Sequence, residues 1–433
     1  MRFLLALTAA GAALAASNPK SVTYYKDVLP VLQKNCQTCH RPGEAAPMAF
    51  LTYEQTRPWA KAIKASVLGK QMPPWFADAA HGKWANDRTL SADEIATLSS
   101  WADNGAKEGN KKDAPAPVTF VQGWGIGKPD LVLEMPESFS VPNSGTIEYQ
   151  YIIIPTGLKE DKWIQMAEAR PGNRQIVHHI IAFVREPGSK WFADQKPGVA
   201  FSPKTMAANG QQRQGGNDEA SREFLVGFAP GSPPEVLRPG SAKLLKAGSD
   251  LVLQMHYTAT GKAGTDKSAI GLVFAKDPVE KRVFTSAVST TKFAIPPGAS
   301  NHDVKASLTL QEDADLVSLL PHMHLRGKAF EYRAVYPTGE TEILLKVPAY
   351  RFDWQLWYEF ASPKRIPKGT RLEVTGTFDN SANNRFNPDA TKEVKWGEQS
   401  WEEMMMGFFD VAFDAKKDPM DLFRPKKRTG TDD

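Results

Sequence analysis

The two cysteines of this 433-residue chain, Cys36 and Cys39, stand in one Cys-x-x-Cys-His group that ends at His40. At this spacing two thiols can form thioether bonds to the vinyl groups of a haem while the adjacent histidine reaches the iron. A redox-active cysteine pair or half of a zinc site is the alternative, but neither a second cysteine pair nor a surrounding βαβ pattern accompanies the motif. The motif therefore predicts a covalently attached haem c and leaves no cysteine for a disulfide framework.

The residues around this motif have a helical pattern. Amphipathic periodicity and a capping box at Ser91 and Glu94 predict a small all-α domain over residues 17–112. The haem iron needs a sixth ligand, and Met72 offers a thioether in a stiff, proline-flanked segment. His81 is the alternative ligand, and a core methionine that binds nothing is the other interpretation of Met72.

The N-terminus and the charge balance indicate where the protein works. Residues 1–16 combine a basic residue, an apolar run and a small-residue cleavage site, which is the pattern of a secretory signal peptide. We therefore expect an exported protein, in the bacterial periplasm, with no transmembrane segment in the mature chain. Because 53 Lys and Arg are spread among 49 Asp and Glu, no nucleic-acid partner is expected.

The composition changes after residue 112. Proline, alanine and glycine at 113–128 predict a linker, and short apolar runs between Pro and Gly turns then predict β-strands. This region is long for one sandwich, so we expect β-sandwich domains at 129–280 and 281–415, followed by a charged tail at 416–433. The expected fold class is therefore multidomain, with a small all-α domain followed by two all-β domains.

Five of the eight histidines form three strand-like clusters in the β region. His322 and His324 are two residues apart, so on a strand both side chains project from one face and can chelate one ion. His178 and His179 are adjacent, so both can bind one ion only if the strand twists or bulges. The fifth, His256, lies in Gln-Met-His-Tyr. Imidazole at these positions predicts copper or zinc binding.

Three consecutive methionines, 404–406, follow two glutamates in a segment that is otherwise rich in Phe and Val. Alone they would be core residues, but thioether sulfur is a soft ligand that selects Cu(I) over zinc. Combined with the His-x-His pair, they predict a copper site with two histidines, one methionine and open positions. Met404 is the expected ligand, and Met406, on the same strand face, is the alternative.

These motifs carry two resemblances. The N-terminal stretch resembles class I c-type cytochromes, which implies that Cys36, Cys39 and His40 attach the haem and that Met72 is the axial methionine. Residues 129–413 resemble the copper type II, ascorbate-dependent monooxygenases, the family of peptidylglycine α-hydroxylating and dopamine β-monooxygenases. The second resemblance implies two jelly-roll-like domains with one copper each.

The monooxygenase resemblance also implies a role for each cluster. The first domain would hold an electron-transferring copper, distant from the second, through His178, His179 and His256. The second domain would hold the copper that binds oxygen, and its ligands would be His322, His324 and Met404.

Two features depart from the family pattern. No cysteine remains for the disulfides of the animal enzymes. Leu320 stands two residues before the His-x-His pair, where the peptide-amidating branch has an arginine that holds a substrate carboxylate. We therefore do not expect a glycine-extended peptide as the substrate.

The expected function is an O2-dependent copper monooxygenase that hydroxylates a C–H bond of a small substrate. A tethered haem would relay electrons at high effective concentration. The outside donor would be an ascorbate-like reductant or a redox protein. The alternative is a non-catalytic haem-copper electron-transfer or metal-binding protein, and a zinc protein is a third possibility that the methionines disfavour.

Overall fold

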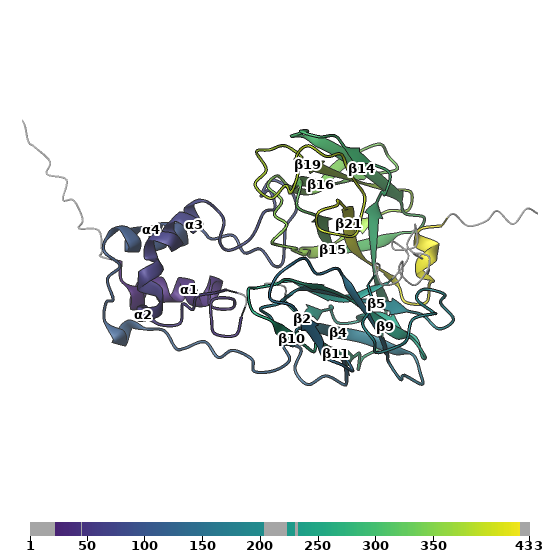
Figure 1. The fold of residues 1–433 in the computed structure, drawn as a ribbon, viewed down its shortest axis with the longest axis horizontal. Helices are drawn as coiled ribbons and strands as arrows, with labels where there is room; N and C mark the ends of the chain where they lie inside the picture. The colour runs from purple at the N-terminus through teal and green to yellow at the C-terminus, as the bar shows by residue number, and fades with distance from the viewer. Residues whose placement is uncertain (1–21, 45, 203–222, 230–232, 425–433) are drawn as a thin grey trace, which may run out of the picture.

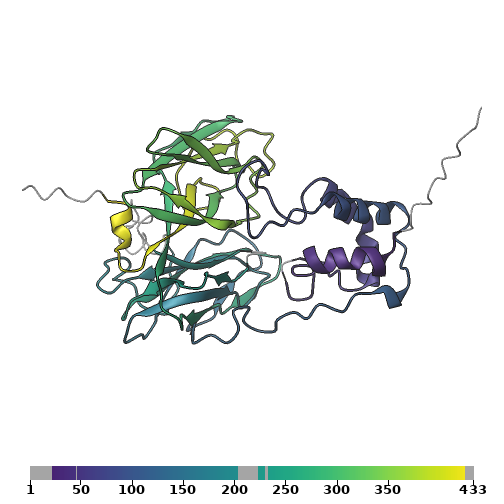
Figure 2. The same ribbon diagram turned by 180° about the vertical axis from the view of Figure 1, so that it is seen from behind.

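The computed structural model describes residues 22–44, 46–202, 223–229 and 233–424, and Figure 1 shows their arrangement. A helical unit lies at one end of the molecule, and two segments of chain join it to a larger β part (Figures 1 and 2). The predicted signal peptide at 1–16 lies outside the described residues. In the described parts of the chain, no helix is long and apolar enough to cross a membrane.

The helical unit surrounds a core of Tyr24, Leu32, Leu98 and Trp101. The predicted capping box begins its last long helix, because the Ser91 hydroxyl accepts the N–H of Glu94 while the Glu94 carboxylate accepts the N–H of Ser91. The elements are a π-helix (Tyr24–Val28), α1 (Leu29–Asn35), α2 (Tyr53–Thr56), a 3-10 helix (Arg57–Trp59), α3 (Ala60–Leu68), α4 (Ala92–Asp103) and a 3-10 helix (Lys111–Asp113).

The segment between α3 and α4 leaves the helical unit and packs on the β part. The rings of Trp75 and Trp84 contact the side chain of Tyr358 in β18 (Tyr358–Ile366). The backbone N–H of Ala85 donates to the carbonyl of Glu359 in the same strand. Residues 17–112 are therefore not one self-contained helical domain, because the aromatic side chains of this segment bury their apolar surface elsewhere.

One nine-stranded sheet runs through both halves of the β part. Its halves are joined by a parallel pairing of β8 and β12, with Lys281 opposite Ser241. The strands, in spatial order, are β1 (Leu131–Glu134), β11 (Ala269–Phe274), β4 (Lys162–Arg170), β8 (Ser241–Leu245), β12 (Lys281–Ser289), β21 (Met405–Asp414), β15 (Ala314–Met323) and β18, with β7 (Glu235–Val236) paired to β4.

Two four-stranded sheets complete two sandwiches. The first contains β3 (Gln150–Pro155), β9 (Asp250–Tyr257), β5 (Val177–Arg185) and β6 (Phe224–Phe228), and the second contains β14 (His302–Thr309), β19 (Arg371–Phe378), β16 (Gly327–Val335) and β17 (Thr341–Val347). Two-stranded pairs are formed by β2 (Phe139–Val141) with β10 (Gly264–Asp266), and by β13 (Ala294–Ile295) with β20 (Val394–Lys395).

Each sandwich has its own hydrophobic core. The first core includes Ile180 and Leu253, and the second includes Phe330 and Phe409. The predicted boundary near residue 280 falls between β11 and β12, where one core ends and the other begins. The chain is thus mostly β, with two cores, but the shared sheet joins the halves more closely than two separate sandwiches would be.

The segment predicted as a linker, 113–128, is attached to the first sandwich along its second half. The ring of Trp124 lies where a side chain on Gly271 would be, and the N–H of Gly125 donates to the carboxylate of Glu168 at 2.6 Å. A segment held in this way is not a free tether. The packing of the Trp124 ring and the partly buried hydrogen bond of Gly125 explain the difference from the prediction.

The predicted charged tail, 416–433, also contains folded structure in its described part. A 3-10 helix, Pro419–Leu422, follows β21. Leu422 is 1% exposed and belongs to the second core. The tail prediction is therefore wrong for these residues, because the apolar side chains among the charges bury themselves against the sandwich.

Candidate metal centres

Strands β5 and β9 bring three histidines together. His179 stands opposite His256 in the antiparallel register, and the register shifts between Val177 and His179, so His178 is the extra residue of a bulge. This bulge lets the two adjacent histidines turn to one side, which the sequence required for shared ligation. One ring nitrogen from each of the three histidines lies within 4.8 Å of the other two.

The three imidazoles are held in the form that binds metals. Burial lowers the pKa of His256 to about 3, with further lowering by His178, and burial and the neighbouring imidazoles hold the pKa of His179 well below its ordinary value. The Nδ1 atom of His256 is buried without a hydrogen-bond partner among the described residues. A neutral, buried nitrogen with a free lone pair fits a copper or zinc ligand.

The second group of metal-ligand side chains lies on β15 and β21. His322 stands opposite Met406, and Met323 stands opposite Met405. Successive side chains of a strand point to opposite faces. Accordingly Met323 and Met405 belong to the second core, and His322 and Met406 lie on the other face. Of the three methionines, Met405 is thereby excluded as a ligand.

The pairing of β15 with β21 ends at Met323 and Met405, and His324 and Met404 are the next residue of each segment, so continued pairing would put them level with each other. Met404 and Met406 are each 7% exposed and share one apolar cluster with Leu320 and Phe408. Both therefore lie on the histidine face, as the strand alternation predicted. Met404 remains the expected ligand because continued pairing would put it level with His324, and Met406 remains the alternative.

Two polar side chains hold this histidine pair. The Nδ1 atom of His322 lies 2.7 Å from Oε1 of Gln355, whose own amide group donates to the carbonyl of Phe352. An amide oxygen only accepts hydrogen bonds, so Nδ1 of His322 carries the proton and Nε2 is left for a metal. Positioning of this kind typically raises the affinity of a metal site.

Glu403 supports the backbone of the same pair. Its fully buried carboxylate accepts the backbone N–H groups of His324 and Arg326 at 3.0 and 2.6 Å. Burial raises the pKa of Glu403 to about 8, although these hydrogen bonds and the Arg326 guanidinium oppose the shift. The side chain thus closes the turn after β15 and fixes where His324 points.

The two histidine groups face each other. The ring of Phe352 stacks on His178 with centroids 5.5 Å apart, and it also approaches His324 with centroids 6.2 Å apart. His322 and His324 are close enough to lower the pKa of His179. The groups are therefore one phenylalanine ring apart in a buried region between the sandwiches. The structure thus brings both predicted histidine groups to the same region of the molecule.

Tyr149 completes the surroundings of the first group. Its ring is 3% exposed and meets His256 edge-on, with centroids 4.8 Å apart. Its hydroxyl is hydrogen-bonded to Ser400, which precedes the methionine run of the other sandwich. This contact ties the two halves together at the candidate site.

The Cys-x-x-Cys-His motif follows α1 in a turn. The Nδ1 atom of His40 lies 3.2 Å from the carbonyl oxygen of Met48, and the imidazole stacks on Phe50 with centroids 4.3 Å apart. A proton donated to that carbonyl leaves Nε2 of His40 for a metal. Burial raises the pKa of the Cys36 thiol to about 12, whereas a redox-active cysteine needs a lowered pKa. These residues fit haem attachment better than thiol redox chemistry.

The expected sixth ligand is not brought to the motif by any contact that the structure shows. Met72 follows α3 and is half-buried, and no hydrogen bond joins its side chain to His40 in the described chain. His81 lies further along the same segment, next to Asp78, whose N–H donates to the carbonyl of Lys346 in β17. Met72 therefore remains a prediction, and His81 is placed beside the second sandwich.

Sequence reasoning missed three residues of the site. Glu403 had a signal, because it directly precedes the methionine run and an acidic residue in an apolar segment needs partners. Gln355 and Phe352 had none, since they lie in the irregular stretch between β17 and β18, where no spacing relates them to the histidines.

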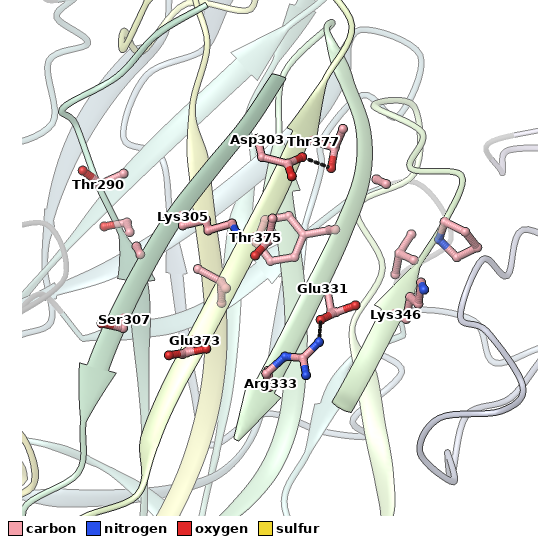
Figure 3. Close-up of a pocket in the computed structure, with 17 residues that line it drawn as sticks. Thr290, Asp303, Lys305, Ser307, Glu331, Arg333, Lys346, Glu373, Thr375 and Thr377 are labelled. Atoms are coloured by element: carbon pink, nitrogen blue, oxygen red, sulfur yellow. Dashed lines mark hydrogen bonds and ion pairs between the residues drawn. The ribbon is translucent and has the colours of Figure 1, made fainter. Parts of the chain in front are cut away.

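A groove of about 860 Å³ lies elsewhere, on the outer face of the sheet that contains β14, β16, β17 and β19 (Figure 3). Its charged side chains largely pair with their neighbours. Arg333 contacts Glu331 at 2.6 Å, and Asp303 accepts a hydrogen bond from Thr377. None of the eight histidines lines this groove, so it is not part of the candidate metal centres.

Comparisons with known proteins add no family. No protein-family model matches the chain, and no curated protein matches it. Among solved structures, the major capsid protein P2 of bacteriophage PM2 is 8% identical, with 66% of this chain and 98% of that chain covered and a TM-score of 0.26. An allantoicase is 12% identical, with 56% and 79% covered and a TM-score of 0.18.

A third structure, PNGF-II, is 11% identical, with 70% of this chain and 62% of that chain covered and a TM-score of 0.23. Likenesses at such low TM-scores support no argument about fold or function.

Proposed function

We propose that this protein is an exported haem- and copper-containing oxidoreductase, an O2-dependent monooxygenase that hydroxylates a C–H bond of a small substrate. The observation that carries the proposal is the meeting of five histidines, three of them buried and two half-buried, and a methionine-bearing strand face, from two sandwiches, in one region of the molecule. Scattered core histidines would not converge from separate sheets with their pKa values lowered together.

The donor sets support copper. In the first group three imidazoles lie close enough to share one ion. In the second group two imidazoles share a strand face with Met406, which stands opposite His322. Copper bound there would exchange single electrons and offer an open position for oxygen. The ligands in this proposal are His178, His179 and His256 for one ion, and His322, His324 and Met404 for the other.

The chain's own residues prepare this site for a reaction at a C–H bond. Gln355 holds the His322 imidazole in one tautomer, and Phe352 separates the two groups. Phe408 and Leu320 line the methionine face with apolar surface. This surface would exclude water and favour an uncharged part of a substrate. It is consistent with a small apolar substrate rather than one held by its carboxylate.

The helical unit supports the electron supply. Its Cys-x-x-Cys-His group and the positioned His40 imidazole fit a haem c, and the segment between α3 and α4 fastens the helical unit to β18. A haem held there would deliver electrons one at a time to the metal region. The external donor, an ascorbate-like reductant or a redox protein, would then need to reach only the haem.

The decisive experiment measures metal content and oxygen uptake of the haem-loaded protein. We expect about two coppers per haem and oxygen uptake that depends on an added benzylic compound with ascorbate as reductant. His324→Ala and Met404→Ala should each lose one copper and this uptake. His302→Ala, on β14, is the matched control and should retain both.

Other outcomes discriminate the alternatives. Two coppers without substrate-dependent oxygen uptake, across a panel of small aromatic and aliphatic compounds, would indicate a non-catalytic electron-transfer protein. Zinc in place of copper after mild purification, or haem without any copper, would contradict the proposal.

A further inference from the structure

An ion cluster joins the haem-attachment loop to the first sandwich. The carboxylate of Glu44 contacts Arg41 of its own loop at 2.9 Å and Arg174, just before β5, at 3.1 Å. The guanidinium of Arg174 also lies over the ring of Phe228 in β6, 5.4 Å from its centroid. Arg174 is thus held from both sides, by the haem-attachment loop and by the sandwich.

This cluster lies at the edge where a haem would be attached. Arg41 directly follows His40, and its Nε donates a hydrogen bond to the carbonyl of Thr38, which lies between the two cysteines. A thioether bond at Cys39 would place the edge of the haem ring next to that sulfur. The edge of the haem would therefore face the strand that carries the first histidine group.

The path from this edge to the histidines is short. Arg174 precedes His178 by four residues, and an extended chain spans at most about 3.6 Å per residue, so their Cα atoms lie no more than roughly 14 Å apart. The ion cluster therefore connects the two redox regions through few residues. The helical unit does not depend on this ion cluster for its connection to the β part. The segment around Trp75 and Trp84 already fastens it to the second sandwich.

We propose that Arg174 is a positioning residue that orients the haem edge toward the three-histidine group and so sets the rate of electron transfer from haem to metal. This inference rests on the proposed function. The Arg174 and Glu44 side chains are 31% and 20% exposed, so the ion pair adds little to folding stability. Its role is orientation, and removing it should leave a folded protein.

The test uses the full haem- and copper-loaded protein without oxygen. The haem is reduced rapidly with a small pulse of reductant while copper is oxidised, and its reoxidation is followed by absorbance at several protein concentrations. The variants are Arg174→Gln, Glu44→Gln, their combination, and the conservative Arg174→Lys. Lys64→Gln is the control, because Lys64 forms a similar ion pair with Asp103 within the helical unit, at 2.6 Å.

We expect concentration-independent haem reoxidation in the wild type and an approximately tenfold slower rate in Arg174→Gln, since small misplacements of reacting groups have large effects on rate. Glu44→Gln and the double variant should be slowed by the same factor, because each loses the same contact. Arg174→Lys should recover part of the rate, and Lys64→Gln should equal the wild type. High salt should slow the wild type but not Arg174→Gln.

Unchanged reoxidation in Arg174→Gln, with haem and copper contents equal to the wild type, would overturn this inference and leave the proposed function intact. No reoxidation of haem in the copper-loaded wild type would overturn both. A rate that falls equally in Lys64→Gln would show a general effect of charge and would also contradict the role of Arg174.

Discussion

The two histidine groups are built by different means. The first depends on a bulge in β5, which turns two adjacent residues toward a third across the strand pair. The second depends on regular pairing at the ends of β15 and β21, where His322 stands opposite Met406, with His324 just after β15 and Met404 just before β21. A local irregularity gathers three identical ligands in one case, and regular alternation mixes histidine with methionine in the other.

The side chains that surround the two histidine groups also differ. The first group is surrounded by aromatic rings, those of Tyr149 and Phe352. The second is held by the polar side chains of Gln355 and Glu403. A group with three equal ligands suits reversible electron exchange, and a mixed group with one methionine suits an open position for a reactant. This difference leads to four predictions.

The largest expected effect is the loss of one metal at a time. His179→Ala removes a central ligand of the first group, so we expect one copper to be lost while the His322 and His324 ion remains. His324→Ala should lose the ion of the second group and keep the ion of the first. Copper per protein and the spectrum of the remaining ion, measured by electron paramagnetic resonance, distinguish the two. Loss of both coppers in either variant would mean that the two groups form a single interdependent site.

The methionine ligand is the next test. Met404→Ala should lower the Cu(I) affinity of the second group by about 100-fold or more, while Met406→Ala should change it by less than about tenfold, because only a ligand supplies soft sulfur to the ion. Competition with a Cu(I) chelator measures both. The opposite ranking would make Met406 the ligand, and equal small effects would argue against sulfur ligation.

A smaller effect is expected from the positioning amide. Gln355→Leu removes the acceptor that holds Nδ1 of His322, so the affinity of the second group should fall by about 10- to 100-fold. The three-histidine group should keep its affinity, which serves as the internal control. Gln355→Glu retains an acceptor and should recover most of the loss. A fall in both groups would point to a folding defect instead.

The smallest effect concerns pH. The pKa of His256 is about 3 in the folded protein, against an ordinary value of 6.5. Between these values the unfolded chain binds more protons than the folded chain, so the metal-free protein loses stability as the pH falls below 6.5, by up to roughly 1.4 kcal/mol per pH unit for this histidine. Above pH 6.5 His256 no longer lowers the free energy of unfolding.

Chemical denaturation of the metal-free protein between pH 7 and pH 5 measures this slope. His256→Gln should flatten it. A slope that is unchanged in this variant would mean that other groups take up the protons on unfolding.

Much of this protein could be inferred from residue patterns alone. The capping box located the start of α4. The Cys-x-x-Cys-His spacing predicts haem attachment, and this stays a prediction. The spacing of His322 and His324 placed them on one strand face, because side chains of a strand alternate with period two whatever the rest of the fold. These are local properties, and local geometry follows from the chain itself.

The tertiary structure decided what spacing cannot express. The bulge at His178, the shared sheet and the Phe352 ring between the histidine groups depend on which strands meet, and strands distant in sequence are brought together by the burial of both cores. The contact of Arg174 with Glu44 joins residues 130 positions apart. Sequence thus determined the residue types of the candidate site and their local faces, and only long-range packing determined that both histidine groups lie in one region.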